Sequence, residues 1–377
     1  MTPYQELLFF YIMGLLLLPA IALGLLEKPL KQYGLFFTVI LLVCVFFENG
    51  QLLALAVFYL WQMALGFLFW RIKKKTRWSL RLAVLLSLLP LLAVKMGAIL
   101  PIPHVFQLLG VSYMTFRSVQ VLLDLHDSKL KELSLLDLSY FLLFFPSVAS
   151  GPIDRYRRFL GDLDRKLSRE EYIEQLRRGV WRLMFGAFFY IVISGLLWQI
   201  WLEPLPKQGV AATISYMYGY TLYLFFNFAG YSAMAIGTAY ILGVSLPENF
   251  RLPFLSVDMK DFWSRWHISL SSWLRDYIYT RFVMRSLKAK RFKNQRTASY
   301  LGYMITMMTM GVWHGLTPAY LLYGAYHGLL MCLNEALDLH WKSFKKLKRG
   351  GWPQVVLALV TFHLFSFGLL IFSGRLL

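Results

Sequence analysis

The chain alternates long apolar runs with short, strongly polar connections. A helix needs about 20 apolar residues to cross the hydrocarbon core of a bilayer. The candidate spans are 7–26, 35–48, 51–70, 82–100, 105–125, 180–202, 211–228, 230–244, 299–316, 318–338 and 353–374. A shorter apolar piece, 139–152, ends in Ser-Gly-Pro and is predicted to enter the membrane without crossing it. The pattern predicts an all-α polytopic membrane protein with about ten or eleven transmembrane helices, forming a single domain over residues 1–377.

The basic connections predict the orientation of these helices. Lys and Arg collect on the cytoplasmic side of membrane proteins. Three clusters contain basic and no acidic residues: Arg71, Lys73, Lys74, Lys75, Arg77 and Arg81; Arg281, Arg285, Lys288, Lys290, Arg291, Lys293 and Arg296; and Lys342, Lys345, Lys346, Lys348 and Arg349. Placing them in the cytoplasm puts the N-terminus outside the cell. The side of the C-terminus depends on the parity of the helix count, which the sequence leaves open.

Composition supports a membrane protein and argues against other classes. The 377 residues are 58% hydrophobic and 16% charged, whereas soluble domains carry about 25% charged residues. The basic residues that give the formal charge of +19 lie between apolar spans. We therefore expect no binding of nucleic acid, which needs basic grooves or stacking surfaces. Cys44 and Cys332 each lie in an apolar run and predict no disulfide framework. No His, Cys, Asp and Glu pattern predicts a metal site.

Two polar segments are predicted to lie on the cytoplasmic membrane face. Residues 154–182 mix basic and acidic side chains with apolar ones, which is typical of an interfacial amphipathic helix. Residues 258–282 are predicted to form a second such helix, in which Asp261 and Arg265 pair one turn apart. Its aromatic stripe at helical spacing is Trp263, Trp266, Leu270, Trp273 and Tyr277.

Candidate chemistry rests on polar residues inside apolar runs. The chain has no G-x-S-x-G elbow, P-loop, dinucleotide fingerprint or H-E-x-x-H motif. His314 follows the apolar run 301–310 and precedes Pro318. A neutral histidine there is either a general base, able to take a proton from an alcohol, or a structural residue bonding a neighbouring helix. His267 leaves the same two interpretations open, while His327 is predicted to be structural.

Further polar and aromatic candidates lie in or beside the spans. They are Arg117, Ser112, Asn227, Trp313 and Tyr231. Polar groups are costly in hydrocarbon, so each of them is expected to face the interior of the helix bundle. There they either line a substrate path or hydrogen bond between helices.

Four motifs in a fixed order carry a family resemblance. They are Phe225-Phe-Asn-Phe-Ala-Gly-Tyr-Ser232, Pro247-Glu-Asn-Phe250, Phe262-Trp-Ser-Arg-Trp-His-Ile-Ser-Leu-Ser271 and Gly311-Val-Trp-His-Gly315. Together they resemble the membrane-bound O-acyltransferase family. The resemblance implies a ring of helices around a central funnel and tunnel, with His314 as the catalytic histidine and His267 on its cytoplasmic side.

Other motifs point to one branch of that family. Gly110-Val-Ser-Tyr-Met-Thr-Phe-Arg117, Ser150-Gly-Pro-Ile-Asp-Arg155 and Arg275-Asp-Tyr-Ile-Tyr-Thr-Arg281 are similar to the branch that transfers D-alanine to teichoic acids. The resemblance implies a bacterial cell-membrane enzyme that holds no cofactor of its own. The donor would be D-alanine on the phosphopantetheine thioester of a small acidic cytoplasmic carrier protein. The acceptor would be a hydroxyl of teichoic acid or of another membrane protein of the D-alanylation system.

The carrier is expected to bind basic residues on the cytoplasmic face. The candidates are Arg155, Arg157, Arg158, Arg285 and Lys288. One departure from the family pattern is Asn227, where relatives often carry Asp. We therefore expect the side chain of Asn227 to contribute only neutral hydrogen bonds. Two alternatives remain: the same fold acetylating an exported polysaccharide of the alginate type, or a transporter with Arg117, Lys95 and His314 lining a translocation path.

Overall fold

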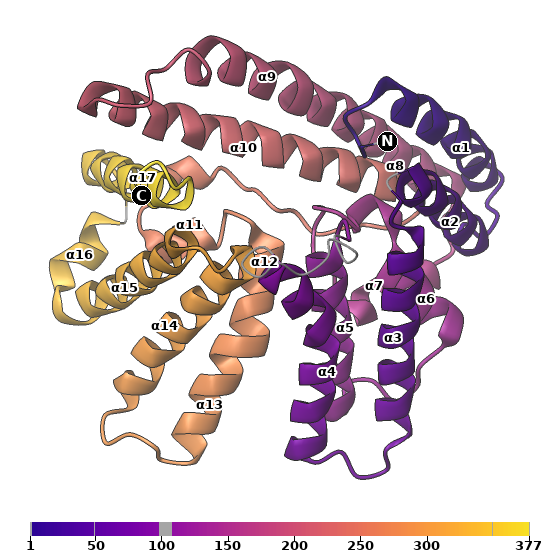
Figure 1. Cartoon of the computed structure of the whole chain (residues 1–377), viewed down its shortest axis with the longest axis horizontal. Helices are drawn as coiled ribbons and strands as arrows, with labels where there is room; N and C mark the ends of the chain where they lie inside the picture. Colours follow the sequence, from indigo (N-terminus) through magenta and orange to yellow (C-terminus); the bar gives the residue numbers. More distant parts are fainter. Residues whose placement is uncertain (1, 49, 98–107, 349, 377) are drawn as a thin grey trace. The chain divides into compact units, whose positions relative to one another are not determined.

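The computed structural model describes residues 2–48, 50–97, 108–348 and 350–376, and is almost entirely helical (Figure 1). Within these residues, β structure is limited to an isolated antiparallel bridge between Phe250 and Trp266. The chain forms two compact units, each of which is described by itself. Unit 1 comprises Met1–Ile191 and Phe228–Pro247, and unit 2 comprises Val192–Asn227 and Glu248–Leu377.

Unit 1 contains the first spans predicted from the sequence. Its elements are α1 (Leu7–Leu25), α2 (Lys31–Glu48), α3 (Leu52–Arg71), α4 (Arg77–Met96), α5 (Val111–His126), α6 (Leu135–Leu143), the 3₁₀ turn η2 (Phe145–Ser147), α7 (Tyr156–Leu163), α8 (Arg169–Ala187), most of the π-helical η3 (Phe188–Ile193) and the second part of α10 (Val210–Ile241). Helices α3, α4 and α5 pack against one another. Residues 98–107, where the fourth predicted span ends and the fifth begins, lie outside the described residues.

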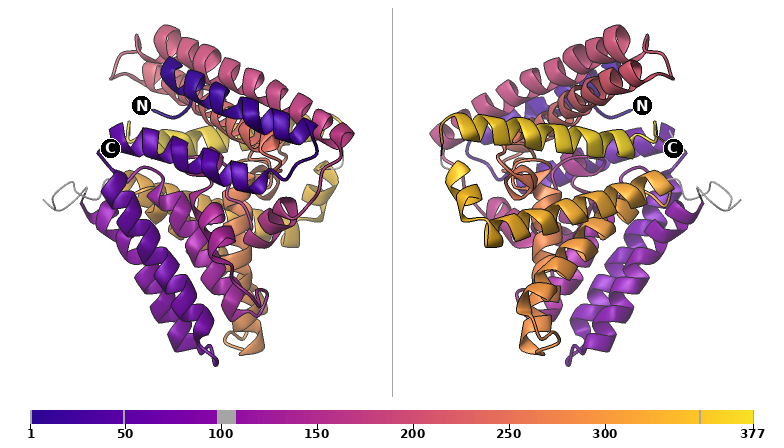
Figure 2. Two further views of the ribbon diagram at one scale, coloured as in Figure 1. Left: turned by 90° about the vertical axis from the view of Figure 1, so that its right-hand side faces the viewer. Right: turned by 90° about the vertical axis from the view of Figure 1, so that its left-hand side faces the viewer.

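Unit 2 contains both histidine motifs. Its elements after η3 are α9 (Ser194–Leu196), the π-helical η4 (Leu197–Leu202), the first part of α10, the 3₁₀ turn η5 (Pro253–Leu255), α11 (Met259–Trp263), α12 (Ile268–Leu274), the π-helical η6 (Arg275–Tyr279), α13 (Thr280–Lys288), α14 (Gln295–His314), α15 (Pro318–His340), α16 (Lys342–Leu347) and α17 (Trp352–Phe372). Helix α14 packs along α15, and α17 lies alongside α15 (Figure 2).

The structure corrects one pair of predicted spans. Residues 211–228 and 230–244 were expected to be two crossings, but they form the single 32-residue helix α10. Six described segments are long and apolar enough to cross a membrane: Leu7–Leu25, Leu52–Arg71, Arg77–Met96, Arg169–Leu202, Val210–Ile241 and Trp352–Phe372. The segment Arg169–Leu202 continues the predicted 180–202 span toward its N-terminus.

Gly230 does not break α10 because it makes a close helix contact. A Cβ at Gly230 would lie 2.7 Å from the carbonyl oxygen of Gly186 on α8. Gly237, two turns further along α10, would meet the carbonyl oxygen of Gly179 at 2.6 Å. Small residues at such positions let two helix backbones approach closely in a membrane. The glycines therefore mark a helix–helix interface within a segment that was expected to form two separate spans.

The segment 139–152, predicted to enter the membrane without crossing it, contains a helix that breaks, and Arg117 holds the break. Helix α6 ends at Leu143, and η2 follows. Arg117 on α5, only 1% exposed, donates to the carbonyl oxygens of Phe141 and Leu142, both at 3.0 Å. It also donates to the carbonyl oxygen of Ser147 at 2.6 Å and to its hydroxyl. Since irregular backbone in a membrane needs partners from the protein, Arg117 supplies the donors that this break requires.

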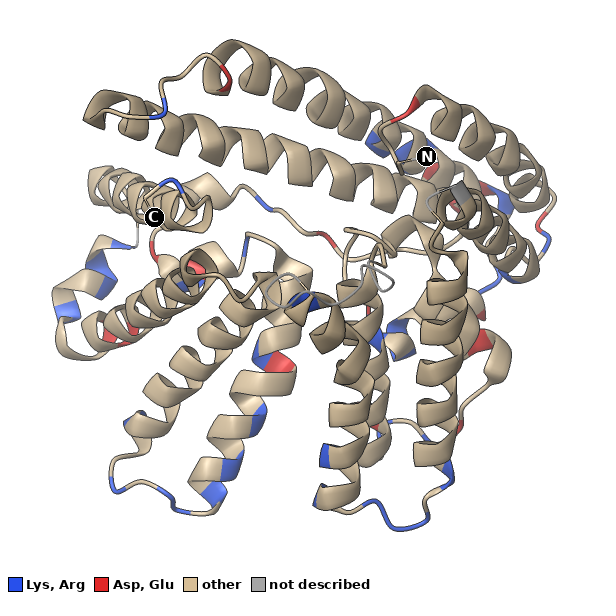
Figure 3. Cartoon of the chain, viewed as in Figure 1, with Lys and Arg blue, Asp and Glu red and all other residues tan. Residues whose placement is uncertain are grey.

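The charged residues are segregated within each unit. In Figure 3, Lys and Arg gather at the connection between α3 and α4 in unit 1 and at the connection between α13 and α14 in unit 2. These are two of the three clusters predicted to face the cytoplasm, and the third lies on and after α16. The distribution is typical of a protein oriented by the positive-inside rule.

A matched pair of glycine substitutions tests the packing of unit 1. A Cβ at Gly24 of α1 would lie 2.2 Å from the ring of Tyr172, which is fully buried and donates to the carbonyl oxygen of Ile241 at 2.9 Å. We expect Gly24→Ala to lower the stability by about 1–3 kcal/mol, the usual cost of overpacking. Gly14→Ala on the same helix, where nothing lies within 4 Å, should have little effect. Thermal unfolding in detergent, followed by intrinsic fluorescence, measures both; equal melting temperatures for the two variants would contradict this packing.

Candidate active site

His314 is the last residue of α14. The helix ends because Gly315 is extended, with φ of 174°, and Pro318 begins α15 with Thr317 as its N-cap. Proline is favoured at the first helical position because it lacks the N–H that would be unpaired there. The sequence therefore places an imidazole at the junction between two helices, as predicted, and its side chain is half-buried.

Two glycines bring α14 and α15 together beside this junction. A Cβ at Gly311 would lie 2.4 Å from the carbonyl oxygen of Tyr320, and one at Gly324 would lie 2.8 Å from that of Met307. Neither position has room for a larger residue, because the contacting atoms belong to backbone. The repeated Gly-x-x-His-Gly pattern at 311–315 and 324–328 is thus explained by close packing between two helices.

Aromatic rings surround His314. The ring centroid of Trp313 lies 4.5 Å from that of His314, and Phe372 of α17 lies 4.9 Å away. Tyr320 and Tyr323 of α15 lie at 6.0 Å and 6.1 Å. These rings restrict the orientation of the imidazole, and the tyrosines add hydroxyl groups to an otherwise apolar setting.

His267 sits where a predicted helix is interrupted. Residues 258–282 were expected to form one amphipathic helix, but α11 ends at Trp263 and α12 begins only at Ile268. His267 has φ of 44°, in the left-handed region that non-glycine residues rarely adopt. The aromatic stripe therefore does not follow a single helix face, although the predicted Asp261–Arg265 pair is present, with an N–O distance of 2.7 Å.

Asn249 and its neighbours hold this interruption in place. Phe250 pairs with Trp266, and the backbone N–H of Arg251 donates to Arg265. The Asn249 backbone carbonyl accepts from the N–H of Ile268 at 3.0 Å, and its side-chain Oδ1 accepts from the Ser269 hydroxyl at 2.6 Å. Asn249 was not among the predicted site residues; the motif at 247–250 carried it only as part of the family resemblance.

The structure brings His267, Trp313 and His314 together. The His267 ring is 5% exposed, and its centroid lies 6.2 Å from that of Trp313. The two imidazoles also interact electrostatically. Trp313 therefore contacts both histidines, as expected for residues that share one reaction site.

His327 has a different environment. It is fully buried among the rings of Trp263, Tyr323 and Tyr326. Neither of its ring nitrogens has a hydrogen-bond partner among the described residues. Its enclosed position agrees with the structural role predicted for it.

A cavity of about 290 Å³ lies in unit 2, and residues within or next to the two histidine motifs line part of it. It is lined by Trp263 and Ile268, which flank the interruption at His267, and by Met310, one turn before His314. Its other lining residues are Lys260, Ser264, Ser271, Ser272, Leu274, Arg275, Tyr279, Tyr303, Thr306, Met307 and Met331. The cavity thus combines flexible apolar side chains with hydroxyl groups and two cations, a lining suited to an elongated ligand with polar and apolar parts.

An ionic cluster that includes the cavity residue Lys260 anchors α11. Lys260 pairs with Glu335 and with Asp338, and Lys348 contacts Asp258 and Asp338 at 2.5 Å each. Burial lowers the pKa of Lys348, but the hydrogen bonds to Asp258 and Asp338 outweigh it and the pKa is raised. The ammonium group therefore stays charged and links the connection after α15 to the start of α11.

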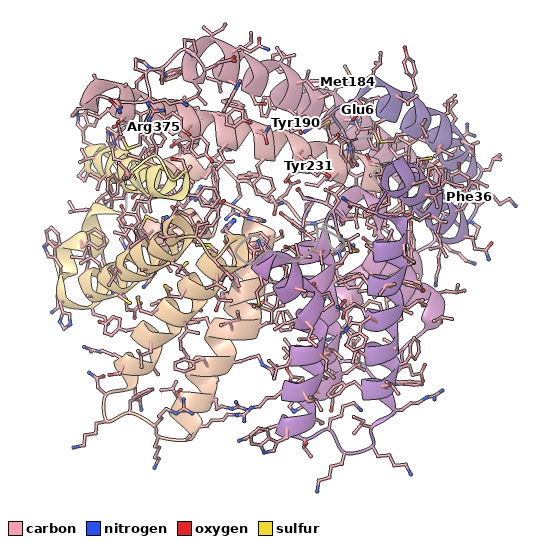
Figure 4. The ribbon with its side chains drawn as sticks, in the orientation of Figure 1. Glu6, Phe36, Met184, Tyr190, Tyr231 and Arg375 are labelled. Atoms are coloured by element: carbon pink, nitrogen blue, oxygen red, sulfur yellow. The ribbon has the colours of Figure 1, made fainter. Side chains whose placement is uncertain are left out.

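The remaining predicted tunnel residues are distributed over both units. Asn227 lies within α10 in unit 2 and is half-buried. Arg117, Ser112 and Tyr231 belong to unit 1. Tyr231 packs against the rings of Tyr4 and Tyr190, with centroid distances of 5.2 Å and 6.1 Å (Figure 4).

The predicted carrier-binding residues differ in how far their side chains are exposed to solvent. Arg285 and Lys288 are exposed on α13, and Arg157 is exposed on α7. Arg155 is half-buried. The guanidinium of Arg158 is occupied by Asp154 and Asp162, so it contributes to the packing of α7.

The order of the motifs and the pair of histidines point to one family, and a comparison decides it. The chain matches the model of the membrane-bound O-acyltransferase family over residues 30–373. The protein belongs to this family. It is therefore a polytopic membrane acyltransferase, and the helical architecture of both units agrees with that assignment.

Two of the relatives named here are similar over the whole chain, and a third over part of it. A teichoic acid D-alanyltransferase of Bacillus subtilis is 42% identical, covering 100% of this chain and 98% of the relative. One of Streptococcus thermophilus is 35% identical, covering 100% and 96%. A probable alginate O-acetylase AlgI of Pseudomonas syringae is 30% identical but covers only 64% of this chain and 45% of the relative.

Asn249 offers a test of how the site is positioned. Asn249→Ala removes the acceptor for the Ser269 hydroxyl, and leaving a buried polar group unpaired costs about 1–3 kcal/mol. We expect acyl transfer to fall on the order of 10²-fold because the backbone at His267 shifts.

Asn249→Asp, which keeps the acceptor oxygen, should retain more activity than the alanine variant at equal expression. Initial rates and thermal stability, measured on both variants, provide the comparison. Alanine and aspartate variants with the same rate would show that this hydrogen bond does not position His267.

Proposed function

We propose that this protein transfers D-alanine from the phosphopantetheine thioester of a small acidic carrier protein to a hydroxyl presented from outside the cell. The transfer serves the D-alanylation of teichoic acid. Full-length similarity to two teichoic acid D-alanyltransferases supports this choice. The observation that carries it is the pairing of His267 and His314 through Trp313 at the junction of α14 and α15.

His314 acts as the general base. Its imidazole takes the proton of the acceptor hydroxyl, and the oxygen attacks the carbonyl carbon of the thioester. The tetrahedral intermediate collapses, the carbon–sulfur bond breaks, and the imidazolium returns the proton to the leaving thiolate of the carrier. The half-buried ring of His314 leaves room for an approaching hydroxyl. A positioned histidine contributes about 10²–10⁴-fold to such a transfer.

His267 is a positioning residue on the donor side. Its left-handed backbone, fixed by residues 249–251, holds the ring beside Trp313. The cavity lined by Ile268 and Met310 offers the thioester arm a path with hydroxyl and thioether groups. Arg275 on its lining suits the phosphate of phosphopantetheine. The chain itself needs no bound cofactor, because the carrier brings the activated acyl group.

The carrier approaches the cytoplasmic face. The exposed Arg285 and Lys288 on α13 give unit 2 a positive potential that attracts an acidic protein, and Arg157, exposed on α7 of unit 1, is a further candidate. Such complementarity acts mainly on the association rate and on specificity. In this orientation the N-terminus lies outside, and α17 leads from the basic residues 342–348 to the outer face.

Both alternatives have less support than D-alanyl transfer. The alginate O-acetylase similarity covers less of both chains than the D-alanyltransferase similarity does. A transporter would be suggested by repeated halves with interrupted helices at matching positions. The short repeat around His314 and His327 is explained by packing of α14 on α15.

Substituting the two histidines tests the mechanism. We expect His314→Ala to lower D-alanine transfer about 10²–10⁴-fold while leaving the protein folded in membranes. For His267 the informative change is Asn, because asparagine tolerates the left-handed backbone found there.

His267→Asn should reduce transfer and leave the melting temperature nearly unchanged. The exposed His340 at the end of α15 provides the control. Incorporation of labelled D-alanine, normalised to protein in the membrane, measures all three variants. Undiminished incorporation by His314→Ala would exclude a general base at this position.

Charge reversal on α13 tests carrier binding. The double change Arg285→Glu and Lys288→Glu should lower the association rate of the D-alanyl carrier about tenfold at low salt, with a smaller effect at high salt. The same net change at Lys342 and Lys345 controls for total charge. Surface-immobilised protein and soluble carrier give the rates; identical losses for both pairs would argue against a binding site on α13.

A further inference from the structure

A second cavity, of about 260 Å³, lies in unit 1 among the neighbouring helices α3, α4 and α5 (Figure 1). Residues of the segment 54–61 on α3 and of the segment 89–94 on α4 form its walls, and the buried Leu108 and Val111 lie at its base. All of its lining side chains are apolar or aromatic. Exposed residues on both walls, such as Val57 and Leu89, show that it opens to the surface of the helices.

Pro90 fixes the wall of this cavity. Proline has no N–H to donate to the carbonyl oxygen of Leu86, one turn earlier on α4. The indole Nε1 of Trp61 on α3 donates to that carbonyl instead, at 2.9 Å. The side chain of Gln62 donates to the next carbonyl, that of Ser87, also at 2.9 Å. The ring of Trp61 is therefore held by the backbone of α4 and forms a fixed part of the cavity wall.

An exposed apolar stripe on α4 leads to the cavity. Trp78, Leu82, Leu85 and Leu89 follow a spacing of four, three and four residues, which places them on one face of a helix. They are 49% to 76% exposed. At the rise of an α-helix, Trp78 lies about 16 Å from Leu89. This is close to half of the roughly 30 Å hydrocarbon core, so the stripe covers the depth of one leaflet.

The stripe begins at a basic cluster that has an available arginine. Residues 71–81, at the connection of α3 with α4, contain six cations and no acid (Figure 3). The Nζ of Lys75 is occupied by backbone carbonyl oxygens at the end of α3. Arg81 is exposed, and its guanidinium carbon lies 4.7 Å from the ring centroid of Trp78. No carboxylate among the described residues pairs with Arg81, so its N–H donors are open to a ligand.

We propose that this face of unit 1 binds an anionic phospholipid of the cytoplasmic leaflet. The phosphate lies at Arg81, and one acyl chain runs along the stripe from Trp78 into the cavity beside Pro90. A guanidinium matches phosphate oxygens in pairs, and basic clusters at the cytoplasmic ends of spans attract anionic lipids. The positive-inside rule explains the total charge of the cluster. It does not explain an arginine held by a ring at the start of an apolar path that ends in a cavity.

The charges favour a lipid over a second copy of the chain as the occupant. All copies of a membrane protein share one orientation, so a copy packed symmetrically on this face would bring its own residues 71–81 to the same depth. Two clusters of like charge would then face each other without an acidic residue between them. An anionic phospholipid has the opposite charge at the basic end and an apolar chain at the cavity end.

Lipid binding to the headgroup site can be measured without substrate. Full-length protein in detergent is titrated with phosphatidylglycerol or with phosphatidylcholine, and native mass spectrometry counts the bound molecules. We expect one tightly bound phosphatidylglycerol per chain and at least fivefold weaker binding of phosphatidylcholine. Arg81→Gln should weaken binding of phosphatidylglycerol about fivefold. Lys74→Gln makes the same charge change at an exposed residue of the connection and should leave the affinity within twofold.

Filling the cavity tests the position of the acyl chain. Ala93 is an exposed residue of the cavity wall, and Ala93→Phe places a ring in the space proposed for the chain. It should weaken binding of both lipids at least fivefold. Ala56→Phe adds the same ring at an exposed position of α3 that does not line the cavity, and should change the affinity less than twofold. Ala54→Phe fills the cavity from α3 and replaces Ala93→Phe if that variant does not fold.

The melting temperature gives an independent measure, because a ligand that binds only the folded protein raises it. Phosphatidylglycerol should raise it in the wild-type protein and in both control variants, and less in Arg81→Gln and Ala93→Phe. Equal losses of affinity for Arg81→Gln and Lys74→Gln would overturn the site, because a general surface potential would then explain binding. Undiminished binding by the folded cavity-filling variants would also overturn it. A lipid-free dimer that Ala93→Phe dissociates would assign the cavity to a second copy and refute the lipid.

Discussion

Backbone hydrogen bonding is the constraint on which the arrangement of this protein depends. Inside a bilayer no water is available to satisfy an interrupted helix, so each interruption needs partners from the protein. The chain breaks its helices after Leu143, between Trp263 and Ile268, and between His314 and Pro318. Arg117 satisfies the first break and Asn249 the second, while at the third Thr317 and Pro318 form a new helix start. His267 lies in the second of these breaks, and His314 ends the helix at the third.

This constraint explains why the site is rigid. His267 adopts a left-handed backbone only because the residues around Asn249 pair with both of its neighbours. His314 ends a helix that touches α15 through glycine, so its position follows the packing of two backbones. Trp313 lies against both imidazoles and so connects the helix break at His267 with the one at His314. A reaction between a thioester and an alcohol benefits from such fixed groups, because orientation is established before the reactants meet.

Several cations hold structure and do not face solvent freely. Arg117 is buried in unit 1, where backbone oxygens occupy its guanidinium group, and the half-buried Arg158 is occupied by two carboxylates. Lys260 and Lys348 similarly anchor α11. By contrast, Arg285 and Lys288 are exposed on α13.

The amino-acid sequence by itself determined the helical membrane class, the segregation of basic residues and the helix junction at His314. These follow from local signals: apolar length, charge in the connections, and proline after glycine. The sequence could not place Asn249 beside Ser269, or the rings of Trp313 against His267, because those contacts join segments that only packing brings together. It also divided residues 211–244 into two spans and assigned residues 258–282 to one helix. The tertiary structure decided otherwise, since a glycine facing another helix packs instead of turning, and pairing with Phe250 interrupts a helix that periodicity alone would continue.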